Sequence, residues 1–507
     1  MPNPPSQPGI YVQELPTGPR SIAAVGTSVA AFVGGARRGP LDTPVRVFGL
    51  ADFERTFGGH WPQFPMSQAV RQFFLNGGGE AVVVRVARRS GPEAARQAVI
   101  DLGDGTHLEA STPGSWGNQL AVAVATGDDP DAFDLSVLEL ADGEPPPGTP
   151  AAFTVREQFI AMSMQPGNPR FLAKVLLESS MLVRVAALGT TRPSATNGSP
   201  RAALPGSGSD GGPIGAAEVS DEANRAAKTG IYALPEPGGF NLLCIPPFTP
   251  DTHDNGLATW AAASALCRER RAMLLVDAPA DWKVADAERG IGAYAALARE
   301  NAAIYFPWLQ VMDPSKAGAS LRSAPCGAVA GVICRSDAQR GVWKAPAGTA
   351  ATLVGATGLL VGGRPLGLND TDIGRLNPLG INCLRLMPPG APAVWGARTL
   401  AGGDGQASEW KYLPVRRLAL FIEASLAQGT AWAVFEPNDE PLWAQLRLAV
   451  GNFMQALFRE GAFQGATPGE AYFVRCDAST TTAADIQAGR VNLVVGFAPT
   501  RPGEFVV

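Results

Sequence analysis

The chain has little of the chemistry on which enzymes and nucleic-acid-binding proteins depend. Its 507 residues include only 3 histidines, and 17% are charged, against about 25% in an average soluble protein. Aspartate and glutamate (46) outnumber lysine and arginine (41), which gives a net charge of -5. A weakly acidic chain has no field that attracts phosphate backbones, so a nucleic-acid partner is disfavoured.

The sequence also lacks the short motifs of common catalytic and nucleotide-binding sites. It has no GxSxG and no GxxxxGK[ST], and neither glycine cluster, 76–80 or 361–367, has the strand–GxGxxG–helix order. Helix ends and turns explain these glycines better. His253, between Asp251 and Asp254, lies in a loop rich in Gly, Pro and Asp that is solvated by default. We therefore predict no catalytic residue, cofactor or metal, and keep an α/β hydrolase as a remote alternative.

Disulfide frameworks and membrane spans are equally disfavoured. The 6 cysteines have no CxxC spacing, and most lie in apolar, strand-like segments such as NLLCIPP, GVICR and INCLRL. This pattern favours buried, reduced thiols. The first residues do not resemble a secretory signal. The longest weakly polar run, 351–363, is shorter than the roughly 20 residues of a membrane helix. We expect synthesis and assembly in the cytoplasm, without membrane insertion.

What is present is a mixed pattern of strands and helices in several domains. At roughly 150 residues per domain, the length suggests about three folding units. Residues 91–230 carry strand-like segments, a low-complexity loop at 194–213 and Pro-rich breaks, which predict a separate β-rich domain. The strand-like segments are LAVAVAT, FDLSVLEL, FLAKVLL and MLVRVAAL. On either side the pattern is α/β, with strands such as AVVVRVA, NLLCIPP and MLLVDAP between amphipathic helices.

The C-terminal section has the strongest periodicity. Helices are expected at 414–429 and at 441–460, the second capped by Asn438 or Asp439 and ended by Gly461. Strands are expected at VWGARTL, TAWAVFEP, AYFVRCD and VNLVVGFAP. Earlier in the chain, helices are expected at 50–59, 66–79, 258–272 and 284–302.

Both ends of the chain carry short β-prone segments, PGIYVQELP and RPGEFVV, which Pro or Gly separates from the rest. An unpaired strand exposes backbone donors and acceptors, and adding that strand to a sheet of another molecule satisfies them. The pattern alone leaves two alternatives open. Each segment pairs either with a neighbouring molecule or with its own sheet.

Several long segments of the sequence together form a recognisable pattern. They are PGIYVQE, TSVAAFVG, the stretch from DFERTFGG to FFLNGGGEAVVVRV, NAAIYFPWLQVMDP, GAVAGVICRSDAQRGVWKAPAG, LNPLGINCLR, VWGARTL, WKYLPVRRLALFIEASLAQGTAWAVFEPND and GEAYFVRCDASTTTAADIQAGRVNLVVGFAPTRPGEF. These segments resemble, in the same order, the tail sheath proteins of contractile phages and related contractile injection systems. The likeness covers roughly 20–90 and 230–507, whereas 91–230 match no pattern of the family.

The resemblance implies a fold that is mixed α/β and α+β and multidomain. A conserved inner sheath domain would be built from N- and C-terminal parts, with a variable, β-rich outer domain inserted. The domains expected in this way are an extended arm at 1–20, the first part of the sheath domain at 21–90, the outer domain at 91–230, an α/β middle domain at 231–370, a C-terminal sheath domain at 371–500 and a second extended arm at 501–507.

The resemblance also implies a mechanical function. Sheath subunits stack as hexameric rings around an inner tube, and contraction of the sheath drives the tube through a target envelope. The implied partners are further copies of the chain, an inner tube protein, and baseplate and terminal cap proteins. The particle would be a phage tail or a phage tail-like particle that lysis releases.

Two groups of residues would then make contacts between subunits. In the family, both arms insert as strands into neighbouring sheets, and the matching residues are Ile10, Tyr11, Val12, Gln13, Glu504, Phe505, Val506 and Val507. The family holds its tube through an inward-facing helix, for which 441–460 is the candidate. Its polar face carries Gln445, Asn452, Gln455 and Arg459, and the alternative is that this face is solvated or contacts another sheath subunit.

The alternatives within this interpretation differ in the particle that is built. A phage tail and a bacterial injection particle are not distinguished by one chain. A type VI secretion sheath fits less well, because that apparatus divides its sheath between two polypeptides, and here both conserved regions lie on one. A shell or tube that never contracts is the remaining structural alternative, although an inner tube subunit would be a much shorter chain.

Overall fold

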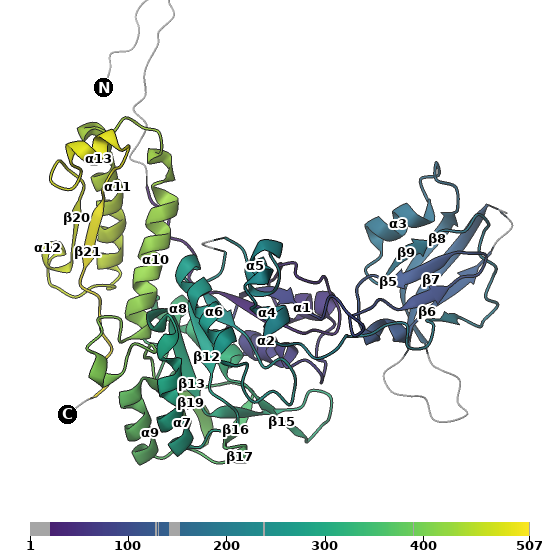
Figure 1. Cartoon of the computed structure of the whole chain (residues 1–507), viewed down its shortest axis with the longest axis horizontal. Coiled ribbons are helices and arrows are strands. Elements are labelled where there is room, and N and C mark those ends of the chain that lie inside the picture. Colours follow the sequence, from purple (N-terminus) through teal and green to yellow (C-terminus); the bar gives the residue numbers. More distant parts are fainter. Residues whose placement is uncertain are drawn as a thin grey trace, which may run out of the picture. The chain divides into compact units, whose positions relative to one another are not determined.

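A computed structural model describes residues 21–126, 129, 131–140, 153–236, 239–388 and 390–505 (Figure 1). The chain divides into two compact units, Thr27–Arg416 and a second unit formed by Arg417–Val507 together with the residues up to Gly26. The larger unit contains several sheets, and both units contain helices and strands. The predicted fold class, mixed α/β and multidomain, is confirmed.

The centre of the larger unit is an eight-stranded sheet with the order β19-β18-β13-β12-β11-β1-β3-β2. Its strands from β18 to β3 are parallel, and β19 and β2 pair antiparallel at the two edges. The strands are short, buried runs of Val, Ala, Leu and Ile, as is typical of parallel strands covered on both faces. Their bounds are β1 Val29–Gly34, β2 Val45–Val47, β3 Glu80–Arg85, β11 Leu242–Cys244, β12 Met273–Asp277, β13 Ala302–Phe306, β18 Ile381–Met387 and β19 Ala391–Val394.

The order of these strands differs from their order along the chain. From β1 the chain adds β3 on one side and then β11, β12, β13 and β18 on the other. This is a doubly wound sheet, and its direction of growth reverses between β1 and β11. In open sheets of this kind, ligands bind beyond the carboxyl ends of the strands at that reversal.

Helices cover both faces of the central sheet (Figure 1). On one face, Trp260 and Leu266 of α6 pack in a buried cluster with alternate strand residues. On the other face, the ring of Phe73 in α2 lies 5.5 Å from that of Phe32 in β1, and α8 packs against α2. The helix bounds are α1 Leu50–Phe57, α2 Met66–Leu75, α6 Leu257–Arg270, α7 Val284–Gly290, α8 Cys326–Arg340 and α9 Asp370–Leu376.

Two predictions for this unit are corrected by the structure. The helix expected at 284–302 ends at Gly290 and is followed by a 3-10 turn, Ile291–Ala296. Gly290 and Gly292 disfavour a longer helix, and a side chain at Gly290 would collide with the ring of Trp282. The segment GVICR, taken as strand-like, lies inside α8, although Cys334 is buried as expected.

Beside the central sheet lies a small antiparallel sheet with the order β15-β14-β16-β17. Trp308, at the start of β14, donates its indole N–H to the carbonyl of Ala278 at 2.7 Å, which fixes this sheet near the end of β12. The bounds are β14 Trp308–Met312, β15 Ser320–Ser323, β16 Ala356–Val361 and β17 Arg364–Pro365.

The inserted region forms two antiparallel sheets around a core of its own. Arg96 and Ser209 pair in an antiparallel bridge, so the two ends of the insertion lie side by side. Residues 214–234 pack instead against the central sheet, so the closed insertion ends before residue 230. Its elements are β4 Val99–Asp101, β5 His107–Ala110, β6 Leu120–Ala125, β7 Ala132–Leu140, β8 Phe153–Ser163, α3 Leu172–Ser179, β9 Val183–Ala187 and β10 Arg201–Ala202; the short helices α4 Ala216–Val219 and α5 Ala223–Ala227 follow it.

The segment FLAKVLL in this region is helix α3, not the expected strand. Leu172, Val175 and Leu176 are buried, and their spacing of three and four residues is that of one helix face. The period of 3.6 was therefore present in the sequence and outweighs the β propensity of Val175.

The segment VWGARTL is also not the expected strand beyond Val394, where β19 ends. Asn382 in β18 holds this segment in place: its amide donates to the carbonyls of Ile304 and Arg398, and its Oδ1 accepts from the Arg398 N–H at 2.7 Å. Arg398 is fully buried and donates to Asp404 and to the carbonyls of Asn377 and Gly402. An isolated antiparallel bridge between Arg398 and Tyr412 takes the place of a continuous strand.

The smaller unit contains two long helices and a two-stranded ribbon (Figure 1). Its core includes Phe421 and Phe453, whose rings lie 6.0 Å apart, and Ile22 packs where a side chain at Gly429 would lie. Asp439 caps the second helix by accepting the Leu442 N–H, as predicted. The bounds are α10 Leu413–Gly429, which begins in the larger unit, α11 Glu440–Arg459, α12 Pro468–Ala471, β20 Tyr472–Arg475, α13 Ala483–Gln487 and β21 Val494–Phe497.

The prediction of a strand at TAWAVFEP is wrong. Residues Ala431–Ala433 form a 3-10 turn between α10 and α11, and Val434 and Phe435 are exposed. The segment has strand-forming residues, but it pairs with no strand among the described residues, and a strand without a partner is not stable. No helix within the described ranges is both long enough and apolar enough to span a membrane.

Candidate functional site

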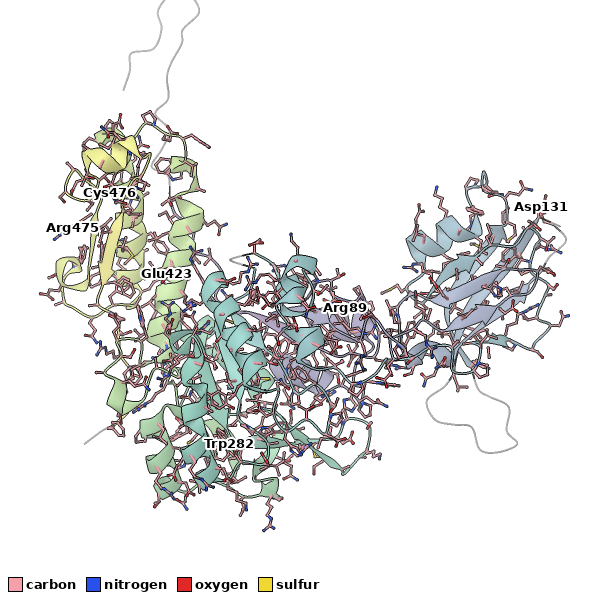
Figure 2. The ribbon with its side chains drawn as sticks, viewed as in Figure 1. Arg89, Asp131, Trp282, Glu423, Arg475 and Cys476 are labelled. Atoms are coloured by element: carbon pink, nitrogen blue, oxygen red, sulfur yellow. The ribbon has the colours of Figure 1, made fainter. Side chains whose placement is uncertain are left out.

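The ribbon β20–β21 is the first candidate surface for assembly. Tyr472 pairs with Phe497 and Arg475 with Val494, and among the described residues the two strands pair only with each other. Figure 2 marks Arg475 and the buried Cys476 at the end of β20. A two-stranded ribbon is marginally stable alone, and its outer edges present free backbone groups.

One face of the ribbon is held by the rest of the unit. The ring of Phe463 lies 6.1 Å from that of Tyr472 and 5.6 Å from that of Phe497. The Tyr472 hydroxyl donates to Gln455 Oε1 of α11 at 2.8 Å. Packing therefore positions the ribbon, and the outer edges of its strands are the parts that could pair with another strand.

The predicted strand-exchange residues lie only partly within the described ranges. Ile10, Tyr11, Val12 and Gln13, together with Val506 and Val507, lie outside them. Glu504 and Phe505 are described, and the Phe505 side chain is 73% exposed. Just before them, Pro499 bridges to Phe463, which anchors the chain beside the ribbon.

The exposed face of α11 is the second candidate surface. Gln445, Asn452 and Arg459 are exposed and share one side of the helix with Leu448, which is 55% exposed. Gln455 differs from the prediction: it lies at the edge of this strip, is half-buried and holds Tyr472. The structure thus brings three of the four predicted residues together and adds a large apolar side chain to them.

Phe435 is a surface residue that the sequence analysis missed. Its side chain is fully exposed, and its backbone has a φ of 68°, which is unusual for a bulky residue. Val434 beside it is 65% exposed. Two adjacent exposed apolar side chains are a typical component of a protein–protein contact. No sequence pattern indicated this exposure, because the segment has the composition of a buried strand.

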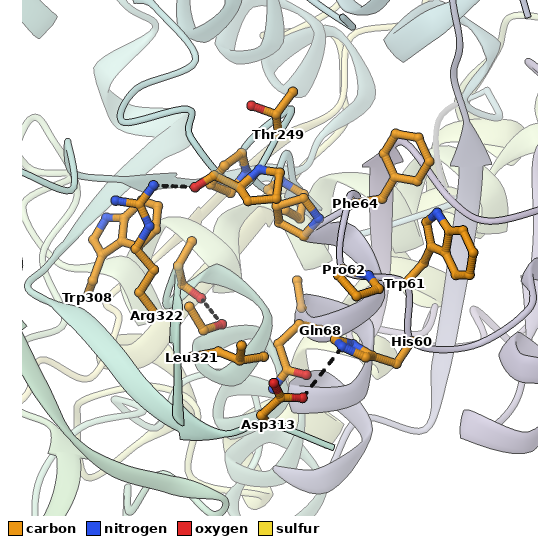
Figure 3. Close-up of a pocket in the computed structure, with 17 residues that line it drawn as sticks. His60, Trp61, Pro62, Phe64, Gln68, Thr249, Trp308, Asp313, Leu321 and Arg322 are labelled. Atoms are coloured by element: carbon orange, nitrogen blue, oxygen red, sulfur yellow. Dashed lines mark hydrogen bonds and ion pairs between the residues drawn. The ribbon is translucent and has the colours of Figure 1, made fainter. Parts of the chain in front are cut away.

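The third candidate is a pocket in the larger unit (Figure 3). It encloses about 150 Å³ and lies beyond the carboxyl ends of β1, β11 and β13. Its walls combine aromatic rings and prolines with a few polar side chains; they include His60, Trp61, Phe64, Gln68, Pro246, Pro250, Trp308, Asp313 and Arg322. His60 Nε2 lies 4.0 Å from Asp313 Oδ1, and burial lowers the pKa of His60.

The strongest perturbed acid–thiol pair is buried next to the central sheet. Cys326, at the start of α8, donates its backbone N–H to Asp277 Oδ1 at 2.8 Å. Burial raises the pKa of Asp277 to about 7 and raises the pKa of the Cys326 thiol well above its usual value. A protonated, fully buried thiol is a poor nucleophile, because the thiolate is the reactive form.

The remaining residues do not assemble a catalytic group either. His253 lies in an exposed loop, and its backbone carbonyl accepts the Ala280 N–H. Within the described ranges, no group of three or more His, Cys, Asp or Glu side chains could hold a metal ion. The geometry therefore directs attention to the surfaces of the smaller unit and to the pocket.

The structure thus combines a doubly wound core, an inserted β domain and a C-terminal unit that carries a two-stranded ribbon. Comparisons with known proteins identify chains that are similar to it. Residues 406–507 match the phage tail sheath C-terminal domain family. The tail sheath protein of Burkholderia phage BcepMu is 24% identical over 474 residues, which cover 90% of this chain and 87% of the phage protein.

Solved structures show the same fold over nearly the whole chain. The PVC sheath complex of an extracellular contractile injection system, in its contracted state, has a TM-score of 0.58 at 22% identity and covers 100% of this chain and 97% of its own. The sheath tail protein of Listeria innocua has a TM-score of 0.60 at 14% identity, with coverage of 95% and 96%. This chain is similar to contractile tail sheath proteins, and the predicted resemblance is confirmed.

Proposed function

We propose that the chain is the structural subunit of a contractile sheath, which polymerises as stacked hexameric rings around an inner tube and contracts to drive the tube through a target envelope. In this role it acts without catalysis or a cofactor. The free energy that drives contraction of the sheath is the difference in free energy between two packings of the same subunits, and it is released cooperatively. Its partners are other copies of itself, an inner tube protein, and baseplate and terminal cap proteins.

The observation that carries this proposal is the ribbon β20–β21 in a chain whose ends carry β-prone segments. A strand added to an open edge pairs its backbone donors and acceptors and links two subunits without a rigid interface. Residues 10–13 and 504–507 are the segments that supply such strands. A mesh joined in this way stays connected while the subunits move as rigid bodies.

The test is a proline in the first segment. Val12→Pro removes a backbone donor that a strand ladder needs, whereas Val12→Ala keeps the donor and is the matched control. We expect both variants to fold with unchanged circular dichroism and melting. Negative-stain microscopy should show striated tubes for wild type and Val12→Ala, and only subunits for Val12→Pro and for a chain lacking residues 1–15. Normal tubes from the proline variant and from the truncation would refute strand exchange at this end.

The exposed strip of α11 is proposed to contact the inner tube. Leu448 supplies buried apolar area and Arg459 a charge, and both are exposed in the subunit. Leu448→Asp should leave sheath polymerisation intact and abolish co-purification of the tube protein. If Leu448→Asp instead prevents polymerisation, the strip contacts another sheath subunit.

Phage tails and bacterial injection particles remain two versions of this proposal. Neighbouring capsid and terminase genes would indicate a phage tail, and a neighbouring ATPase and toxin cargo without capsid genes would indicate an injection particle. Either particle would assemble in the cytoplasm. A hydrolase remains the alternative only if the purified protein turns over a substrate in a panel assay.

A further inference from the structure

The pocket of Figure 3 is lined by a buried side chain whose polar atoms the fold leaves unpaired. Gln68, in the first turn of α2, is 5% exposed, and among the described residues neither its Nε2 nor its Oε1 has a hydrogen-bond partner. In the view of Figure 3, Gln68 lies between Trp308 and Trp61, which stand on opposite sides of the pocket. Buried carboxamides are nearly always paired, so this one indicates a partner that the described residues do not supply.

Two other residues of the pocket wall add polar atoms of the same kind. Trp61 Nε1, which is a donor, and His60 Nδ1 are buried, and neither makes a hydrogen bond among the described residues. Together with Gln68 they come from one short segment, 60–68. Each unpaired buried group needs an explanation, and a ligand that brings polar atoms to this wall explains all of them at once.

The charged side chains of the wall are engaged within the fold instead. Asp313 Oδ1 accepts from the backbone N–H of Ser315 at 2.8 Å and from its hydroxyl at 2.6 Å. Arg322 donates to the carbonyl of Pro250. The unpaired atoms of Gln68 and Trp61, in contrast, belong to neutral groups. Because an ion that enters a buried site needs an opposite charge beside it, this arrangement favours a neutral ligand.

The segment that carries these groups is held in one conformation. The Ser67 hydroxyl accepts the backbone N–H of Trp61 at 3.2 Å and donates to the carbonyl of Phe64 at 3.0 Å. At Gly35, directly after β1, a Cβ would lie 2.2 Å from the Phe64 ring, so only glycine lets this ring rest at the end of β1. The wall is therefore preformed, which lowers the entropic cost of binding.

The position of the pocket supports a binding role independently. Pro246 and Pro250 follow β11, Trp308 follows β13, and Gln68 lies at the start of the helix between β1 and β3. The pocket therefore lies beyond the carboxyl ends of the strands where the sheet reverses its direction of growth. That crevice is the usual ligand site of a doubly wound sheet.

The shape and chemistry of the walls define the class of ligand. Trp61, Phe64 and Trp308 supply aromatic surface, and prolines supply most of the remaining apolar wall. A free volume of about 150 Å³ accommodates one ring of about the size of benzene. The Gln68 carboxamide has a donor and an acceptor side by side, so a second carboxamide pairs with it through two parallel N–H···O bonds.

We propose that the pocket lined by Gln68, Trp61 and Trp308 binds a small, neutral, planar ring that bears a primary carboxamide. The ring occupies the space between the aromatic walls, and its carboxamide pairs with that of Gln68. The inference does not rest on the sheath function, because it concerns recognition of a small molecule by one subunit.

The first test compares three probes on the unmodified full-length protein by titration calorimetry. Benzamide carries both the ring and the carboxamide, N,N-dimethylbenzamide lacks the N–H donors, and toluene lacks the amide. We expect saturable binding of benzamide that is at least tenfold tighter than that of either control. Absence of saturable benzamide binding would mean that water alone satisfies Gln68 and would overturn the proposal. Equal binding of benzamide and toluene would overturn it as well.

The second test assigns the selectivity to Gln68. Gln68→Met keeps a side chain of similar volume and removes its donor and acceptor. It should weaken benzamide binding at least tenfold and leave toluene binding unchanged or tighter, whereas general damage to the pocket would weaken both. Gln158→Met, at an exposed position of β8, is the matched control and should change neither. Unchanged preference for benzamide in Gln68→Met would refute the assignment.

The third test locates the probe on the wild-type protein and needs no variant. Light-activated 4-azidobenzamide should label the pocket segments 60–69, 246–250 and 308–324, and excess benzamide should suppress this labelling at least tenfold. Labelling confined to other segments, or labelling that benzamide does not suppress, would contradict the proposal. None of the three measurements involves polymerisation, so the proposed sheath function can fail its own test without altering these results.

Discussion

Replacing Gly331 by alanine tests how closely α8 and α2 pack on the central sheet. A Cβ at this position would lie 2.5 Å from the carbonyl oxygen of Phe73 and 2.7 Å from the Cβ of Asn76. Gly327, one turn earlier, would place its Cβ against the backbone of Ala69, closer still. The obstacles include backbone atoms of α2, which cannot move as a flexible side chain does. An ordinary contact of about 3.5 Å then requires the two helices to separate by about 1 Å.

The expected cost follows from two opposing effects. Overpacking a buried contact costs about 1–3 kcal/mol. Alanine in place of a helical glycine recovers about 0.5–1 kcal/mol of helix propensity. Gly331→Ala should therefore lower the free energy of unfolding by about 1–2 kcal/mol. Adding Gly327→Ala should cost less than the sum of the two changes, because the same separation of the helices relieves both collisions.

Urea unfolding followed by circular dichroism measures the effect. Gly374→Ala is the matched control, because no atom of the neighbouring structure lies within 4 Å of the Cβ that would be added in α9. It should raise the free energy of unfolding by about 0.5–1 kcal/mol. The packing argument is refuted if Gly331→Ala is as stable as the wild type while Gly374→Ala behaves as expected.

Three further changes probe other parts of the molecule. Burial raises the pKa of Asp277 to about 7, so the folded state binds this proton more tightly than the unfolded state. The stability that the group contributes below about pH 4 is therefore lost as the pH rises towards 7. Asp277→Asn should remove this loss, measured by urea titrations from pH 5 to 8. Asn382→Leu removes the hydrogen bonds of the Asn382 side chain to the Arg398 N–H and to the carbonyls of Ile304 and Arg398 and should cost at least about 2 kcal/mol, measured by urea unfolding. Asp439→Ala removes the cap of α11 and should cost about 1 kcal/mol, with faster hydrogen exchange confined to its first turn.

The sequence by itself determined the long helices, the central strands and the resemblance to tail sheath proteins. The amphipathic period placed α10 and α11 almost to the residue, because a helix is specified by neighbours three and four positions apart. The buried runs of the central strands, and the long collinear segments that resemble tail sheath proteins, needed no tertiary information either.

Pairing partners and exposure were decided only by the tertiary structure. The segment 430–437 has the composition of a strand, but it pairs with no described strand, and Phe435 is exposed in a turn. The path of the chain after Val394 depends on Asn382 and Arg398, whose hydrogen bonds join two different segments of the chain. In each case the conformation depends on contacts with residues far away in the sequence, which local propensity does not take into account.

The candidate sites were also identified partly from the sequence and partly only from the tertiary structure. Sequence periodicity found the polar face of α11, but only the position of Tyr472 showed that Gln455 belongs to the support of the ribbon. The pocket combines residues from around 60, 250 and 310, and its existence depends on the order β3-β1-β11-β12-β13 in the sheet. That order is set by burial and pairing over the whole unit, because each strand carries a similar apolar run and its own sequence does not specify its neighbour.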